Sequence, residues 1–107
     1  MSTGRIMRLI VFFDLPVTTK SQRKEYTNFR NFLLDNGFVM LQYSVYVRIT
    51  RNHDDLQKYI RRVSNNLPPE GKVRCLSITD KQYANMIIML GNNENEEELG
   101  SSELIEL

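Results

Sequence analysis

The sequence predicts an α+β domain in which two helices cover one face of an antiparallel sheet. Apolar runs rich in β-branched and aromatic residues alternate with segments of helical spacing, in the order strand, helix, strand, strand, helix, strand. Right-handed crossovers between strands of one sheet place both helices on the same face of that sheet. The chain has 107 residues, enough for one domain with a modest core.

The first strand is the most informative segment. Leu9 to Phe13 is a run of five apolar residues that stops on Asp14, with Leu15 and Pro16 directly after it. Such a run is typical of a central strand that is buried on both faces. An acid at the end of a rigid strand lies where functional sites form in α/β layers. Asp14 is equally a candidate for simply capping the turn.

A helix is predicted over residues 19–36, because its apolar residues fall on one face at roughly 100° per residue. Gly37 ends it. Residues 38–49 are strand-like throughout, longer than the usual strand of about 5–6 residues. We therefore expect two strands, about 38–42 and 45–50, joined by a tight bend.

A second helix is predicted over about 54–66, with Pro68 and Pro69 ending it. A strand follows at 72–79, and a final short apolar strand is expected at 86–90. The predicted fold is therefore a ferredoxin-like βαββαβ sandwich with an extra C-terminal strand. We expect its second sheet face to be apolar or half-apolar, with nothing left in the chain to cover it. We expect a homodimer that buries this face, with 86–90 pairing onto the partner's sheet.

The net charge of +1 conceals two segments of opposite charge. Residues 1–91 hold all 14 Lys and Arg and 7 of the 13 acids, leaving +7, whereas residues 92–107 hold six acids and no base, giving −6. A basic body favours a polyanionic partner, and an acidic tail screens that surface or docks on another protein. We divide the chain into a folded domain, 1–91, and an acidic C-terminal tail, 92–107.

Several protein classes are excluded by composition. The single cysteine, Cys75, rules out an internal disulfide and fits a reducing cytosol, and its place in a strand-like stretch predicts a packed thiol. No run is long enough for a secretory signal, and none approaches the ~20 apolar residues of a membrane span. We expect a soluble, cytoplasmic bacterial protein.

Several motifs together resemble the CRISPR-associated protein 2 family. They are the run Arg8 to Pro16, the helix segments Arg23-Lys24 and Phe29 to Leu33, the pair Gly37-Phe38, and Gln42 to Tyr46. The stretch Leu76 to Ala84, running into Met86-Ile87-Ile88, is similar to the version that accompanies a single large DNA-cutting effector (type II systems). The resemblance covers about residues 7–91.

The resemblance implies a homodimer that bridges two dimers of the CRISPR integrase, CRISPR-associated protein 1. That assembly holds a short duplex of foreign DNA for integration into the repeat array. The family is also described as a metal-dependent nuclease, with activity on single-stranded RNA or duplex DNA in some members and none in others. Its metal site is the acid at the end of the first strand, which here is Asp14, one from each subunit.

A single Asp14 in each subunit gives only limited support to a metal-dependent nuclease. A divalent metal neutralises phosphoryl oxygens and activates water, and Mg²⁺ (or Mn²⁺) is held by one or two carboxylates plus substrate phosphate. Two Asp14 side chains across a two-fold axis would make such a site. His53 is assigned to a capping or surface position. The other acids of the body are assigned to helix surfaces or turns: Glu25, Asp35, Asp54, Asp55, Glu70 and Asp80.

Holding DNA needs only a basic surface that follows phosphates without reading bases. The candidate contacts lie in the two helices and near strands, and each is equally a candidate for a plain solvated charge. They are Arg23, Lys24, Arg30, Arg48, Arg51, Lys58, Arg61, Arg62 and Arg74. We assign the acidic tail to docking on the integrase, with plain disorder as the alternative.

Other functions remain open at this point. A stand-alone RNA-cutting toxin similar to virulence-associated protein D would use the same Asp14 dimer site. An RNA-recognition-type module would stack bases on Tyr43 and Tyr46, although the aromatic signature of such domains is absent. A metabolite-binding regulatory dimer is a further alternative, but the sequence contains no small-ligand motif for it.

Overall fold

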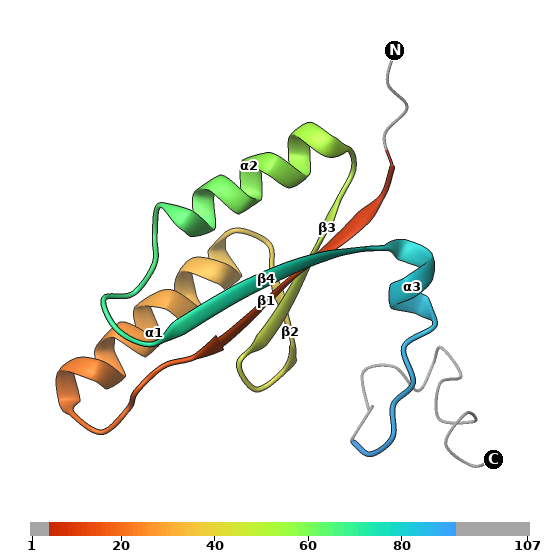
Figure 1. Ribbon diagram of the computed structural model, residues 1–107. Helices are drawn as coiled ribbons and strands as arrows, with labels where there is room; N and C mark the ends of the chain where they lie inside the picture. The colour runs from red at the N-terminus through yellow and green to blue at the C-terminus, as the bar shows by residue number, and fades with distance from the viewer. Residues whose placement is uncertain (1–4, 92–107) are drawn as a thin grey trace.

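The computed structural model describes residues 5–91, which form a four-stranded sheet and three helices (Figure 1). The strand order is β2-β3-β1-β4, and every neighbouring pair is antiparallel. This confirms the ferredoxin-like α+β arrangement. In chain order the elements are β1 (Met7–Asp14), α1 (Lys20–Asp35), β2 (Val39–Gln42), β3 (Val45–Thr50), α2 (His53–Ser64), β4 (Lys72–Thr79) and α3 (Asp80–Ala84).

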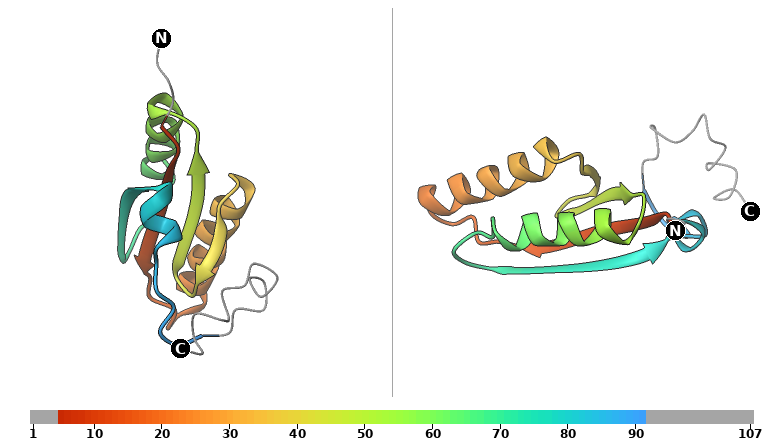
Figure 2. Two further views of the ribbon diagram at one scale, coloured as in Figure 1. Left: turned by 90° about the vertical axis from the view of Figure 1, so that its right-hand side faces the viewer. Right: turned by 90° about the horizontal axis from the view of Figure 1, so that it is seen from above.

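Helices α1 and α2 lie on one side of the sheet, and neither of them covers its other side (Figure 2). The core forms between them and β1, whose alternate residues Leu9, Val11 and Phe13 are buried. The Phe13 ring packs edge-on against the Phe29 ring of α1, with centroids 5.2 Å apart. Further core residues are Leu15, Leu33, Phe38, Tyr46, Leu56, Tyr59 and Val63.

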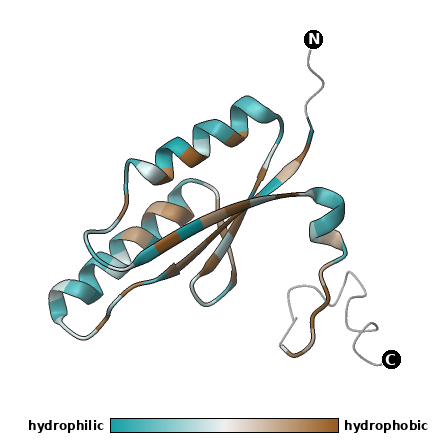
Figure 3. Cartoon of the chain, viewed as in Figure 1, coloured by the Kyte–Doolittle hydropathy of each residue, from teal (hydrophilic) through white to brown (hydrophobic). Residues whose placement is uncertain are grey.

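This other side, which we call the open face, carries the other half of the β1 alternation. Direct partners in antiparallel strands share a face, so Phe12 stands beside Val45 of β3 and Arg74 of β4, and Ile10 stands beside Val47 and Leu76. Leu76 is 52% exposed, whereas Ile10 and Val47 in the middle of this face are buried. Figure 3 shows the apolar residues along these strands. The face also carries charged side chains, among them Asp14 and Arg74, so it is half-apolar, one of the two compositions predicted.

Local chemistry explains where α1 begins and ends. Thr19 and Gln22 form a capping box: the Thr19 hydroxyl accepts from the Gln22 amide, and the Gln22 side chain accepts from the Thr19 amide. At the other end Gly37 has φ +83°, a left-handed conformation that costs a side chain strain energy. A Cβ there would also collide with the Arg48 guanidinium.

The structure differs from the prediction after Thr79. Thr79 and Gln82 form a second capping box, which starts the short helix α3 and turns the chain away from the sheet. Residues 86–90 form no strand within residues 5–91, and their apolar side chains stay largely outside the core, with Leu90 94% exposed. A strand needs a neighbour to hydrogen-bond with, and the described chain offers none there. Pairing onto a partner's sheet stays a prediction.

Two further predictions concern Cys75 and the acidic tail. Cys75 is exposed on β4, an edge strand, so the prediction of a packed thiol was wrong. The acidic tail, 92–107, lies outside the described residues. Among residues 5–91, none of the helices has the length and apolar character needed to cross a bilayer.

Candidate functional site

Asp14 is the last residue of β1 and is exposed. The alternation along β1 turns Phe13 into the core and places Asp14 on the open face, in register with Lys72 of β4. The rigid central strand therefore fixes the backbone beneath the carboxylate, and the register brings a cation alongside it.

The turn between β2 and β3 lies next to Asp14. The Phe13 amide donates to the Ser44 carbonyl oxygen over 3.0 Å, which holds the turn against the end of β1. Together these segments line a hollow of about 440 Å³ that we call the Asp14 hollow. Its lining residues are Phe12, Phe13, Asp14, Tyr43, Ser44, Val45, Lys72 and Arg74.

Gly71 packs closely against the backbone of Asp14. Its φ is +105°, and a Cβ at this position would lie 2.6 Å from the Asp14 carbonyl oxygen and 2.7 Å from the Leu15 Cδ2. Both features require glycine, because a side chain would add backbone strain and push the Asp14 backbone out of place. The loop before β4 is thereby fitted to the end of β1.

Among residues 5–91, Asp14 is the only carboxylate that lines this hollow. Within residues 5–91 there is no cluster of three or more His, Cys, Asp or Glu side chains that would hold a metal ion. Mg²⁺ retains several waters and binds through one or two carboxylates together with substrate phosphate. The Asp14 oxygens suit such an ion, and a second Asp14 would complete the carboxylate pair.

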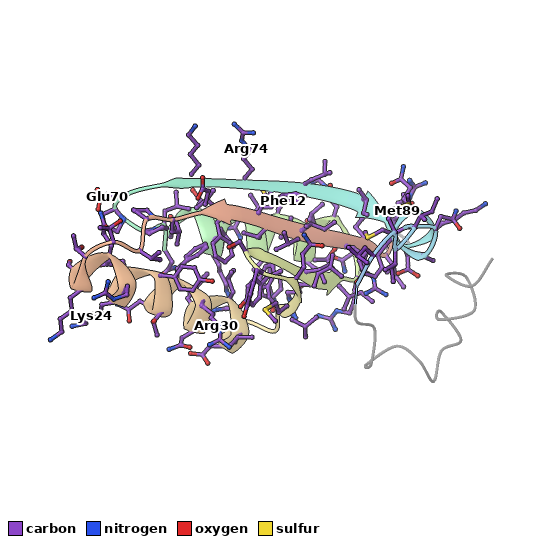
Figure 4. The ribbon with its side chains drawn as sticks, turned by 90° about the horizontal axis from the view of Figure 1, so that it is seen from below. Phe12, Lys24, Arg30, Glu70, Arg74 and Met89 are labelled. Atoms are coloured by element: carbon purple, nitrogen blue, oxygen red, sulfur yellow. The ribbon has the colours of Figure 1, made fainter. Side chains whose placement is uncertain are left out.

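The surface cations point to opposite sides of the domain. Lys24 and Arg30 project from the outer side of α1, whereas Arg74 projects from β4 away from both helices (Figure 4). None of these three side chains forms an ion pair with an acid of residues 5–91. They are therefore available to phosphates as far as the described part of the chain is concerned.

The comparisons with known proteins agree with the fold. The family model of CRISPR associated protein Cas2 matches residues 7–86. The chain belongs to the Cas2 family. A protein named CRISPR-associated endoribonuclease Cas2 from Acidovorax ebreus is 52% identical over 85 residues, covering 79% of this chain and 83% of the relative.

Two further relatives carry the same name. The Treponema denticola protein is 44% identical over 90 residues, and the Ligilactobacillus salivarius protein is 46% identical over 90 residues. In both cases the match covers 84% of this chain and 89% of the relative. A CRISPR-associated role for this member of the Cas2 family follows from these matches.

Some predicted DNA contacts have structural partners in this Cas2 chain. Arg23 Nη1 donates to the carbonyl oxygens of Val17 (3.1 Å) and Thr18 (2.9 Å), so it holds the loop that follows Asp14. Arg62 Nη1 donates to Asn36 Oδ1 over 3.0 Å and ties α2 to the end of α1. Arg61 is exposed on α2.

Arg48 lies on the helix side of the sheet rather than among the surface cations. Its Nη2 donates to the Tyr59 hydroxyl over 2.6 Å, and its Cζ lies 3.8 Å from the centre of the Tyr59 ring. Its Nε is buried and has no hydrogen-bond partner among residues 5–91. Arg48 therefore joins β3 to α2, a structural role that its place in a strand-like segment does not reveal.

The assignment of Asp55 to a helix surface or turn was wrong. Asp55 is buried at the start of α2, where it accepts a 3.0 Å hydrogen bond from the Arg51 amide. Its carboxylate also lies 3.5 Å from both Arg51 Nε and Lys58 Nζ. The Arg51 amide chiefly lowers the pKa of Asp55; burial opposes this, and the Arg51 and Lys58 charges add to the lowering. Arg51 and Lys58 are thus partly neutralised.

Asp14 was predicted from the sequence as a site residue, but the residues around it were not. Lys72 and Gly71 were not recognised, because only the β1–β4 register and the loop packing bring them to Asp14. Tyr46 is 1% exposed and cannot stack on a base, whereas Tyr43 is fully accessible to one. His53 is exposed at the first position of α2, as predicted for a surface residue.

Proposed function

We propose that this member of the Cas2 family works in CRISPR adaptation as a homodimeric scaffold. The dimer bridges two integrase dimers and holds foreign duplex DNA for integration into the repeat array. The observation that supports this most is the open face of the sheet. Phe12, Val39, Ile49 and Leu76 remain more than a third exposed in the single chain, and apolar residues gathered on one face are typical of an interaction surface.

A dimer through the open face doubles the basic surface. The two α1 helices then lie on the outside of the assembly, and each presents Lys24 and Arg30 to solvent. A surface that neutralises phosphates without reading bases suits a protein that must accept any foreign sequence. Arg23 is left out of this surface because it holds the loop after Asp14.

Charge reversal on α1 tests the DNA surface. The variant Lys24→Glu/Arg30→Glu should bind duplex DNA more weakly, and the slope of log affinity against log salt should flatten by about 1.8 for each protomer that contacts DNA. Arg5→Glu/Lys81→Glu changes the net charge equally and is the matched control. Equal losses in both variants would show a general charge effect and remove α1 from the DNA surface.

A metal-dependent endonuclease is the second function that the geometry favours. In the proposed dimer the two Asp14 carboxylates would hold Mg²⁺ or Mn²⁺, which when bound supplies charge neutralisation and an activated water. Lys72 and Arg74 line the same hollow and would attract the phosphate of the scissile strand. Gly71 keeps the Asp14 backbone in place. The names of the relatives support an RNA substrate for this activity.

Asp14→Asn tests the nuclease, because it keeps the shape of the side chain and removes its charge. We expect the variant to dimerise as the wild type does and to lose cleavage of end-labelled RNA or duplex DNA with Mg²⁺ or Mn²⁺. Asp35→Asn, an exposed acid at the end of α1, is the matched control. Equal cleavage by wild type and Asp14→Asn would exclude Asp14 as the metal ligand, and no cleavage by either would leave the scaffold alone.

A further inference from the structure

Tyr43 is the most exposed aromatic side chain among residues 5–91, with 84% of its surface accessible. It lies in the turn between β2 and β3 and makes no hydrogen bond through its hydroxyl to any described residue. A tyrosine leaves a large apolar ring in water at this position, which is unfavourable unless the ring meets a partner. Neither the core nor the proposed DNA surface on α1 uses it.

The turn fixes the backbone that carries the ring. Ser44 adopts φ +65°, a left-handed conformation that non-glycine residues rarely take, and its carbonyl oxygen accepts the Phe13 amide over 3.0 Å. The turn is therefore tied to the residue directly before Asp14. Because Tyr43 precedes Ser44, the backbone beneath its ring is held at the edge of the Asp14 hollow.

The hollow combines the three chemical groups that bind one nucleotide of a single strand. Tyr43 offers an aromatic face, Lys72 and Arg74 offer positive charge, and Asp14 offers a metal ligand. With a volume of about 440 Å³, it is a shallow hollow open to solvent rather than an enclosed cavity, so a strand can cross it. Aromatic rings that stack on bases beside a basic groove are the common way in which proteins hold single strands.

We propose that Tyr43 stacks on an unpaired nucleobase and so makes the Asp14 hollow selective for single-stranded nucleic acid. The proposal rests on the proposed nuclease site and names the residue that selects its substrate. A base inside a duplex has both faces covered by its neighbours, so only an unpaired or terminal base can lie on the ring. The phosphate of that nucleotide lies toward Lys72 and Arg74.

The test measures binding in EDTA, so that it does not depend on cleavage. The probe is a short single-stranded RNA with one 2-aminopurine, compared with the same oligonucleotide lacking the base at that position. We expect Tyr43→Leu and Tyr43→Ala to bind the intact strand at least about fivefold more weakly, while Tyr43→Phe keeps wild-type affinity. The variants should bind the abasic strand as the wild type does.

The 2-aminopurine signal separates stacking from a structural role. Its fluorescence should fall on binding to the wild type and to Tyr43→Phe, and stay unchanged with Tyr43→Leu. Unchanged affinity in Tyr43→Leu would overturn the proposal. So would a loss of affinity that accompanies dissociation of the dimer in sedimentation experiments, because Tyr43 would then be a subunit contact.

The proposal and the nuclease can fail separately. Stacking that depends on Tyr43 in a protein that cleaves nothing would leave the proposal standing and remove the nuclease. Cleavage that depends on Asp14, with Tyr43→Leu binding and cleaving single strands as the wild type does, would overturn the proposal and keep the nuclease.

Discussion

Asp55 shows at the level of one residue how the fold changes the properties of a side chain. Its carboxylate is buried, accepts the Arg51 amide and lies beside two cations, so its pKa is lowered. The folded state therefore binds fewer protons than the unfolded state between the two pKa values of this group. Its stabilising effect is full above the unfolded pKa, about 3.9, and is lost as the pH falls through the folded pKa.

We predict that Asp55→Asn destabilises the protein by about 1–2 kcal/mol at pH 7, because a charged acceptor is replaced by a neutral one. The difference between wild type and variant should shrink below about pH 4, as the wild-type carboxyl gains its proton. Urea unfolding at pH 7 and pH 3 measures both effects. Asp54→Asn, an exposed acid in the same helical turn, is the control. A difference independent of pH would contradict the electrostatic explanation.

At the level of the elements, β1 was predicted well because its signal is local. An uninterrupted apolar run ending on Asp14 identifies both a central strand and the exposed acid at its end, and the helices follow from equally local periodicity. The partners of Arg48 and Arg23 could not be predicted, because they depend on contacts that only the folded chain creates. The same holds for 86–90, whose apolar composition suits a strand but whose pairing partner is absent from the described chain.

Helix α3 follows β4 directly, and one side chain of β1 also binds it. Arg8 Nε donates to Asp80 Oδ1 over 2.8 Å, and the Arg8 guanidinium lies 4.5 Å from the centre of the Tyr83 ring. These contacts set the direction in which the chain leaves the sheet toward 86–90. The ion pair is partly exposed, so its effect on global stability is small, about 0.2–1 kcal/mol.

We predict that Arg8→Gln increases amide hydrogen exchange in α3 and in residues 86–90 and leaves exchange in α1 unchanged. The reason is that few other contacts join α3 to β1, so local opening responds more than global unfolding. A double-mutant cycle with Asp80→Asn isolates the ion pair from the contact with Tyr83. Unchanged exchange in α3 would show that its capping box alone holds it.

For the whole molecule, the proposed dimer depends on the open face. Leu76 lies on this face of β4 beside Ile10, is 52% exposed and is not part of the main core cluster. We predict that Leu76→Asp raises the dimer dissociation constant about 100-fold or more, since a carboxylate would be buried in an apolar interface. Sedimentation measures the constant, and circular dichroism checks that the monomer still folds.

Leu67→Asp is the control for the dimer prediction. Leu67 is equally exposed, at 52%, but lies in the loop between α2 and β4 rather than on the open face. Its substitution should leave the dissociation constant unchanged. A wild-type protein that sediments as a monomer, or an equal effect of the two substitutions, would contradict an interface on the open face.

The single carboxylate of the Asp14 hollow has a consequence for mixed populations of subunits. If wild-type chains and Asp14→Asn chains exchange freely in equal amounts, only about a quarter of the dimers carry two carboxylates. Cleavage would then fall as the square of the wild-type fraction, because a wild-type chain paired with an Asp14→Asn chain would be inactive. A linear fall would show that each subunit works alone.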